Sequence, residues 1–151
     1  MQIRNLQKDD APQIRALVAA CGNYVIPYQT YAYWVLESYF YSTCLVMEHE
    51  DKVIGYLSSV PSPDREVVFL WQICVAAEYR KSKIGSQLLD RFGKICRQQG
   101  HQKMEVTIAG DNIPSQKLFA SFAKRHNTEF ETKKKLTIGG EEDILFSIQL
   151  T

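Results

Sequence analysis

The segment Arg65–Val75, with the sequence REVVFLWQICV, constrains the fold more than any other part of the chain. From its third residue onward only Gln72 is polar, whereas a strand with one solvated face alternates apolar and polar residues. We therefore expect a strand at the centre of a sheet, covered on both faces. Two further strands are predicted before it, over Thr43–His49 and Lys52–Val60, joined by the polar turn Glu50–Asp51.

The helix predicted next, over Lys83–Gln99, begins with an unusual charge. Its apolar residues recur at helical spacing, and Gly100 is placed to end it. Arg80, Lys81 and Lys83 crowd the turn before it, although a helix dipole is already positive at the N-terminus. Positive side chains are favourable there only when an anion binds, and the free N–H groups of a first helical turn bind phosphate oxygens. Strand, basic turn and helix together predict a phosphate-binding site.

The remaining elements complete a mixed α/β order. The central sheet region is preceded by a strand over Gln2–Leu6, a helix capped by Asp10 and ended by Gly22, and an aromatic-rich helix over Tyr31–Tyr41. It is followed by a strand over Lys103–Ala109, a helix capped by Asp111 or Asn112, and strands over Glu129–Ile138 and Asp143–Leu150. The order is β-α-α-β-β-β-α-β-α-β-β, with no linker or repeat, so we expect one domain over residues 1–151.

Composition argues against several classes of function. Charged residues make up 23% of the chain and the formal net charge is +1, which gives no electrostatic reason for nucleic-acid binding. The four cysteines are widely spaced and form no cluster with the three histidines, so we expect no metal site. Their apolar surroundings suit reduced, buried thiols of a cytoplasmic protein. No apolar run approaches roughly 18 residues, so we expect neither export nor a membrane span.

Two motifs are similar to those of a known family. Arg80-Lys81-Ser82-Lys83-Ile84-Gly85 resembles the pyrophosphate loop of the GNAT acyltransferases, which reads Gln or Arg, two residues, Gly, one residue, then Gly or Ala. Here Lys83 replaces the first glycine, and its Cβ either obstructs the phosphate or leaves a working loop with an added charge. The segment Gly110–Ala123, GDNIPSQKLFASFA, resembles the family's N-x-x-(A/S)-x-x-(L/I)-(Y/F) segment. The chain is therefore identified as a member of this family.

The resemblance implies both a fold and a cofactor. The fold is the α/β GNAT fold, with a mixed seven-stranded central sheet flanked by about four helices, and the cofactor is acetyl-CoA. The implied cofactor-binding residues lie on the central strand, in the basic turn and on the helix after the following strand. They are Ile73, Cys74, Val75, Arg80, Lys81, Ser82, Lys83, Ile84, Gly85, Ser86, Asn112, Ser115 and Phe119.

A closer resemblance covers about Val25–Leu150. The stretches FLWQICV, EVTIAGDN and SQKLFASFAK are similar to FVWQVAV, ETTITPDN and SRALFRSFAR of the diaminobutyrate acetyltransferases of ectoine biosynthesis. It implies that the partner is a small-molecule amine substrate. The implied substrate-binding residues are Ile26, Tyr28, Tyr31, Tyr33, Trp71 and Asp143.

Two departures from that group concern the acceptor. Ile26 stands where those enzymes have an aspartate of the substrate pocket, and Gly140 stands where they have a histidine. Both changes remove groups suited to a polar diamine, so we expect diaminobutyrate to be a poor acceptor. Trp71 is either core or a pocket wall, and its neighbour Gln72 should face the other side of the strand.

The candidate catalytic residues are Glu105 and Tyr31. Glu105 lies on the strand that enters the second motif and is either a general base or a structural residue. Phe119 occupies the place where many members carry a tyrosine that protonates the thiolate, so Tyr31 or water must serve as the acid. Cys74 lacks an activating neighbour and should pack in the core. A backbone N–H near Ile73 or Val75 would polarise the thioester carbonyl.

The function predicted from the chain is an acetyl-CoA-dependent N-acetyltransferase acting on a small amine. Two other classes stay open: a CoA-binding protein with weakened catalysis, and a protein N-acetyltransferase, which would need an open groove. The aromatic second helix offers a surface for a homodimer.

Overall fold

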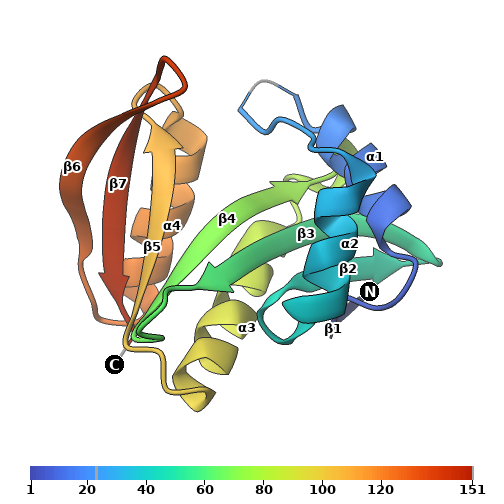
Figure 1. Cartoon of the computed structure of the whole chain (residues 1–151), viewed down its shortest axis with the longest axis horizontal. Helices are drawn as coiled ribbons and strands as arrows, with labels where there is room; N and C mark the ends of the chain where they lie inside the picture. Colours follow the sequence, from blue (N-terminus) through green and yellow to red (C-terminus); the bar gives the residue numbers. More distant parts are fainter. Residues whose placement is uncertain (23, 151) are drawn as a thin grey trace.

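Seven strands form one mixed sheet in the computed structural model, in the order β1-β2-β3-β4-β5-β7-β6 (Figure 1). The strands are β1 (Gln2–Asn5), β2 (Leu45–His49), β3 (Lys52–Pro61), β4 (Val67–Val75), β5 (Lys103–Ala109), β6 (Phe130–Ile138) and β7 (Glu141–Gln149). The α-helices are α1 (Ala11–Ala20), α2 (Thr30–Tyr39), α3 (Ile84–Gln98) and α4 (Ile113–Arg125). The structure describes residues 1–22 and 24–150, so Asn23 and Thr151, both within the predicted domain, lie outside the described residues. The predicted fold class and element order are confirmed.

The pairing of β4 with β5 divides the sheet into two parts. It is the parallel junction in the sheet, and it joins only Val67–Leu70 to Lys103–Val106. Every other neighbouring pair of strands is antiparallel. Beyond the short junction β4 and β5 separate, and Figure 1 shows β5, β7 and β6 fanning away from β1–β4. β4 lies between β3 and β5, as its continuous apolar run predicted.

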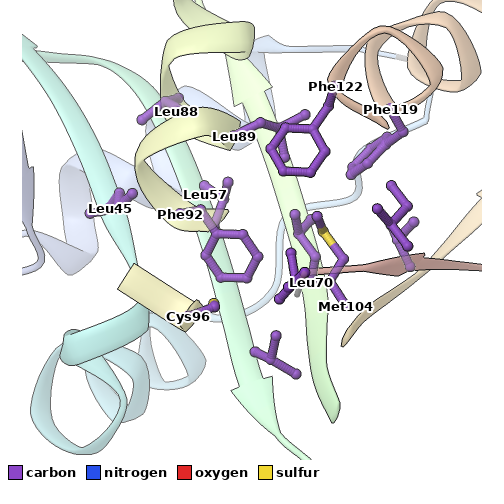
Figure 2. Close-up of a cluster of buried hydrophobic side chains, with 14 of the residues drawn as sticks. Leu45, Leu57, Leu70, Leu88, Leu89, Phe92, Cys96, Met104, Phe119 and Phe122 are labelled. Atoms are coloured by element: carbon purple, nitrogen blue, oxygen red, sulfur yellow. The ribbon is translucent and has the colours of Figure 1, made fainter. Parts of the chain in front are cut away.

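The larger hydrophobic cluster fills the face of the sheet covered by α3 and α4. Figure 2 shows the apolar face of α3 directed at the strands, while α4 adds two phenylalanines. The helical spacing of the α3 residues places them on one side, and burial of each large side chain contributes about 1.5–3 kcal/mol. The residues of the two helices that Figure 2 labels are Leu88, Leu89, Phe92, Cys96, Phe119 and Phe122.

The N-terminal helix α1 is not capped in the predicted way. Asp10 does not cap α1 with its side chain, because its carboxylate accepts hydrogen bonds from the Arg4 guanidinium and from the Gln7 N–H. Glu37 of α2 instead accepts from the N–H groups of Asp9 (2.8 Å) and Ala11 (3.0 Å). A buried carboxylate on a second helix thus satisfies free donors at the start of the first, which fixes α1 against α2.

An extra residue interrupts the register of β4. Ser58 of β3 lies opposite Gln72, but the next residue, Ser59, lies opposite Leu70. Trp71 therefore has no partner on β3 and forms a β-bulge. A bulge inserts one residue into one strand and redirects the side chains that follow.

The bulge moves the side chains of β4 from one face of the sheet to the other. Leu70 packs in the cluster under α3, whereas Cys74 packs in the second cluster under α1 and α2. Trp71 and Gln72 both hydrogen-bond to the segment before α2, at the Tyr28 hydroxyl and the Ile26 carbonyl. The expectation that these neighbours face opposite sides is therefore wrong, because it assumed an unbroken strand.

Candidate functional site

A cavity of about 640 Å³ lies where β4 and β5 separate. The end of α1, the C-terminal half of β4, the turn before α3 and the first turn of α4 enclose it. Its lining residues are Cys21, Tyr24, Val25, Ile73, Cys74, Val75, Arg80, Lys81, Lys83, Gly85, Ser86, Asn112, Pro114, Ser115 and Leu118.

The backbone of β4 presents free polar groups to this cavity. The N–H of Ala76 donates to the carbonyl of Ile54 on β3, at 2.8 Å. Peptide groups of an antiparallel strand alternate in direction, so those of Ile73 and Val75 point away from β3. The Val75 carbonyl accordingly accepts from the Nε of Arg80, at 3.3 Å. Since β5 has diverged at this level, the N–H groups of Ile73 and Val75 can pair with an extended ligand.

The start of α3 supplies a second set of donors. The N-cap residue is Lys83, whose side chain makes no capping hydrogen bond. The Gln87 N–H is the first to reach a helical acceptor, the Lys83 carbonyl, so the N–H groups of Gly85 and Ser86 before it have no partner within the helix. Lys81 and Lys83 also line the cavity here. Dipole, backbone donors and side-chain charge all favour a bound anion at this place.

Lys83 adopts a backbone conformation that favours glycine. Its φ is +61°, in the left-handed region, and it stands where the GNAT loop motif has its first glycine. A residue with a Cβ loses about 1–2 kcal/mol in this conformation. The loop geometry of the motif is therefore kept with strain at Lys83.

Arg80 joins two walls of the cavity. Its Nη2 donates to the Cys21 carbonyl at the end of α1 (2.8 Å), and its Nε donates to Val75 on β4. Its remaining N–H donors are available for a ligand. Arg80 thus orders the cavity rim and also adds to its positive charge.

Two thiols lie side by side in the cavity wall. A hydrogen bond from Cys74 lowers the pKa of Cys21 to about 7, helped by the nearby Arg80 guanidinium. The hydrogen bond with Cys21, together with burial, raises the pKa of Cys74. The predicted packing role of Cys74 agrees with its place in the second hydrophobic cluster.

The first turn of α4 closes the cavity on the β5 side. Asn112 is the N-cap, and its Oδ1 accepts from the Ser115 N–H at 3.3 Å. The hydroxyl of Tyr24 reaches across from the α1–α2 connection and donates to the Asp111 carbonyl, at 3.3 Å. This contact joins the two separated parts of the sheet over the cavity.

An aromatic wall lies next to β4, on the side of α2. The rings of Tyr28 and Trp71 are 5.1 Å apart, and the Trp71 Nε1 donates to the Tyr28 hydroxyl at 3.2 Å. Both side chains are partly exposed. Tyr28 and Trp71 together form the aromatic wall.

The sequence pattern of the acetyltransferase (GNAT) family matches residues 2–123 of this chain. The chain belongs to the GNAT acetyltransferase family. Members of this family use acetyl-CoA, so the cofactor predicted from the sequence is confirmed.

Individual relatives agree with this assignment. The L-2,4-diaminobutyric acid acetyltransferase of Virgibacillus pantothenticus is 31% identical over 123 residues, covering 81% of this chain and 77% of that enzyme. The enzyme of the same name from Shouchella clausii is 31% identical over 101 residues, which span 66% of this chain and only 57% of that enzyme. The structure of diaminobutyrate acetyltransferase EctA from Paenibacillus lautus, in complex with L-2,4-diaminobutyric acid and coenzyme A, superposes with a TM-score of 0.90 at 26% identity. It covers 98% of this chain and 93% of that one, and the closer resemblance is confirmed.

The cavity of about 640 Å³ between β4 and β5 brings together most of the predicted cofactor residues, but three of them lie elsewhere. Ile84 and Phe119 are buried in the larger hydrophobic cluster, and Ser82 is exposed outside the lining. Ile84 and Phe119 sit on helix faces turned to the sheet, so only their backbone could reach a ligand. Sequence reasoning missed five lining residues. Three lie just after α1, and nothing in the sequence shows that this segment folds over β4; two lie on α4, where only Asn112, Ser115 and Phe119 were predicted to bind the cofactor. All five line the larger cavity. They are Cys21, Tyr24, Val25, Pro114 and Leu118.

The predicted acceptor residues of this GNAT chain are more dispersed. Tyr28 and Trp71 form the aromatic wall, but Tyr33 has no exposed surface and cannot contact a ligand. Ile26 and Tyr31 are exposed, and the Tyr31 ring packs against Trp34.

Asp143 lines a separate cavity of about 310 Å³. It lies there with Asp111, Lys135 and Glu142, at the β6–β7 end of the fold. Charged groups of both signs therefore face each other at this smaller cavity.

Two general findings concern the described part of the chain. Within residues 1–22 and 24–150, no three His, Cys, Asp or Glu side chains are grouped so that they could hold a metal ion. Over the same residues, every helix is too short or too polar to cross a lipid bilayer.

Lys83 gives a direct test of the loop geometry. Replacing it with glycine should raise the free energy of unfolding by about 0.5–1 kcal/mol, because relief of left-handed strain exceeds the added entropy of an unfolded glycine. Replacing it with valine should lower the free energy of unfolding by about 1–3 kcal/mol. Equilibrium denaturation measures both changes. Lys81→Gly is the matched control and should not stabilise the protein; equal stability of all three variants would contradict the strain.

Proposed function

We propose that this chain is a cytoplasmic N-acetyltransferase that moves the acetyl group of acetyl-CoA to the amine of a small molecule, within one domain. The observation that carries the proposal is the cavity between β4 and β5. It combines an open strand edge with a basic, uncapped helix start. A long ligand with an amide-containing arm and a pyrophosphate would pair with both. The relatives named as diaminobutyrate acetyltransferases support a small amine as the acceptor.

The residues divide the work of the reaction between them. The N–H groups of Gly85 and Ser86, with Lys81, hold the pyrophosphate. Acetyl-CoA supplies an acetyl thioester when bound. The N–H of Ile73 or Val75 would donate to the thioester carbonyl oxygen and stabilise the negative charge that develops there. Positioning of amine and thioester contributes most of the rate.

Glu105 is proposed to receive the proton of the attacking amine. Met104 and Val106 pack under α3, so Glu105 lies on the opposite face of β5 by strand alternation. Its register neighbour on β4 is Phe69, two residues before Trp71. Glu105 thus shares a face with the aromatic wall, and it does not line the larger cavity. Proton transfer therefore runs through water.

Water is also the proposed acid for the departing thiolate. Tyr31, the other candidate, is 71% exposed and its ring packs on Trp34, at 5.7 Å. Tyr31 is not one of the residues that line the larger cavity. The tyrosine position of other members is filled here by Phe119, which is buried.

The acceptor is proposed to carry an apolar portion beside its amine. The aromatic wall supplies contact area, while Ile26 offers no carboxylate to a second ammonium group. Gly140, at φ +82° in the turn between β6 and β7, offers no side chain at all. An unpaired charge in such a pocket is costly, whereas apolar contact contributes about 25 cal/mol per Å².

Replacing Arg80 with alanine should weaken CoA binding by about 1.5–3 kcal/mol, the scale of a charge-assisted hydrogen bond. The loss also removes the Arg80 contacts to Cys21 and Val75 that order the rim. Isothermal titration with CoA measures the change. Arg125→Ala is the matched control, because Arg125 pairs with Asp90 away from the cavity. If both variants bound CoA as tightly as the wild type, Arg80 would not be part of the CoA site.

A panel of amines graded by charge and apolar size tests the acceptor. We expect kcat/KM to be higher for amines with an apolar portion than for diaminobutyrate. Trp71→Ala should lower kcat/KM about tenfold, since loss of ~60 Å² of contact is worth ~1.5 kcal/mol. Trp34→Phe is the control and should not change it. If diaminobutyrate or polyamines were the best substrates and Trp71→Ala had no effect, the acceptor would bind away from the aromatic wall. If peptides were the best substrates, the chain would be a protein acetyltransferase.

Location and assembly are proposed from the surface and the thiols. Cys44, Cys74 and Cys96 are buried free thiols, which suits a reducing cytoplasm and is checked by cell fractionation.

Tyr31, Trp34 and Tyr39 form an exposed aromatic row on α2, with ring centroids 5.7 and 5.9 Å apart along it. We expect this row to pair in a homodimer. Sedimentation should give about twice the 17.3 kDa of one chain, and Trp34→Glu should halve that mass; a monomeric wild type would refute the dimer.

A further inference from the structure

We propose that Gln72 and Tyr33 are positioning residues that hold the segment Ile26–Tyr28 against β4 and so fix the aromatic wall that meets the acceptor amine. The inference rests on the proposed function and deepens it, because it assigns acceptor specificity to two side chains that lie behind the wall.

A closed ring of hydrogen bonds joins β4, α2 and this segment. The Gln72 Nε2 donates to the Ile26 carbonyl at 2.9 Å. The Gln72 Oε1 accepts from the Tyr33 hydroxyl at 3.1 Å. That hydroxyl in turn accepts from the Tyr28 N–H at 3.2 Å. Each side chain therefore contacts both the segment and its partner.

The segment depends on these bonds because it has few partners of its own. Residues 25–29 belong to no helix or strand, and Pro27 has no N–H to donate. Gln72 and Tyr33 bind the backbone on either side of Pro27, at the carbonyl before it and the N–H after it. Among the described residues, one further side chain bonds to this backbone: the Arg15 Nε donates to the Tyr28 carbonyl at 2.9 Å.

The hydrogen bonds of the ring are buried away from water. Tyr33 has no exposed surface and Gln72 is 8% exposed, so water does not readily replace a lost partner. Burial also raises the pKa of Tyr33, which keeps its proton available for Gln72. The Tyr33 ring packs edge-on against Tyr56, at 5.9 Å, and this contact holds the hydroxyl in place.

The ring controls the wall through the bulge in β4. Trp71 and Gln72 are neighbours that both face the segment, so one holds the Tyr28 hydroxyl and the other holds the Ile26 backbone. Without the Gln72 contact, the Trp71–Tyr28 bond would be the one remaining side-chain hydrogen bond from β4 to Ile26–Tyr28 among the described residues. The CoA cavity instead uses the backbone of Ile73 and Val75, which point the other way. Positioning should therefore act on the amine and not on CoA.

Steady-state kinetics of Gln72→Met and Tyr33→Phe test the inference. Both variants keep the volume of the side chain and remove its hydrogen bonds. We expect the KM for the amine to rise about five- to twentyfold, with kcat changed less than threefold and the Kd for CoA changed less than twofold. The double variant should be no worse than the poorer single variant, because both act through one ring.

A matched control separates positioning from general loss of packing. Ser59→Ala removes another buried side chain-to-backbone bond, from the Ser59 hydroxyl to the Thr43 carbonyl (2.8 Å), on the strand next to β4. It should lower stability without changing the amine KM. An equal rise in KM for Ser59→Ala, additive effects of the two ring variants, or an unchanged KM in both would overturn the inference.

Tryptophan fluorescence gives a reading that does not depend on turnover. The chain has two tryptophans, so Trp34→Phe leaves Trp71 as the sole reporter of the wall. Adding Gln72→Met should shift Trp71 emission to longer wavelength and increase its quenching by acrylamide, while the far-ultraviolet circular dichroism stays unchanged. If the wild type transferred no acetyl group, the proposed function would fail, and this emission would still decide the positioning; unchanged emission in the folded variant would refute it.

Discussion

The short parallel pairing of β4 with β5 is the constraint on which the rest of the structure depends. It holds the two parts of the sheet together over Val67–Leu70 and Lys103–Val106 and then ends. Beyond it, backbone groups of β4 that would be paired in a continuous sheet face a cavity. The bulge at Trp71 lies directly after the last paired residue, and it places Gln72 and Cys74 on the side of α1 and α2. The end of this pairing therefore opens the larger cavity, and the adjacent bulge positions the aromatic wall.

Charge and strain at the start of α3 follow from the same arrangement. The strand β4 leads directly into the turn, so the end of the open edge and the uncapped helix lie next to each other. A ligand that pairs with the edge meets the helix dipole at its far end. Lys83 keeps a left-handed backbone that glycine would adopt freely, and it adds a charge that glycine lacks. At this position the chain accepts backbone strain and gains a positive charge that attracts an anion.

Sequence reasoning reached the fold because local patterns and family motifs encode it, and most residues it assigned to the cofactor line one cavity. The apolar run of β4 predicted its central place in the sheet, and the basic turn predicted an anion site at the start of α3. It failed where contacts between distant segments decide. Asp10 looked like a helix cap, but Arg4 and the Gln7 N–H occupy its carboxylate and Glu37 supplies the cap.

The bulge was equally hidden from the sequence. No Gly or Pro marks Trp71, so strand alternation put it and Gln72 on opposite faces. Ile84 and Phe119 matched family positions, yet their helix faces turn them into the core. The motif position of Tyr33 suggested that it contacts the substrate. Its side chain is buried, so we assign it to holding the segment Ile26–Tyr28 in place.

A crystal structure of the protein with CoA tests the central claim most directly. The account predicts the pyrophosphate within about 2.7–3.2 Å of the Gly85 and Ser86 N–H groups. It also predicts that the amide-containing arm pairs with the backbone of Ile73 and Val75 in the gap beside β5. A pyrophosphate bound away from the start of α3, or an arm that leaves the β4 edge unpaired, would contradict the account.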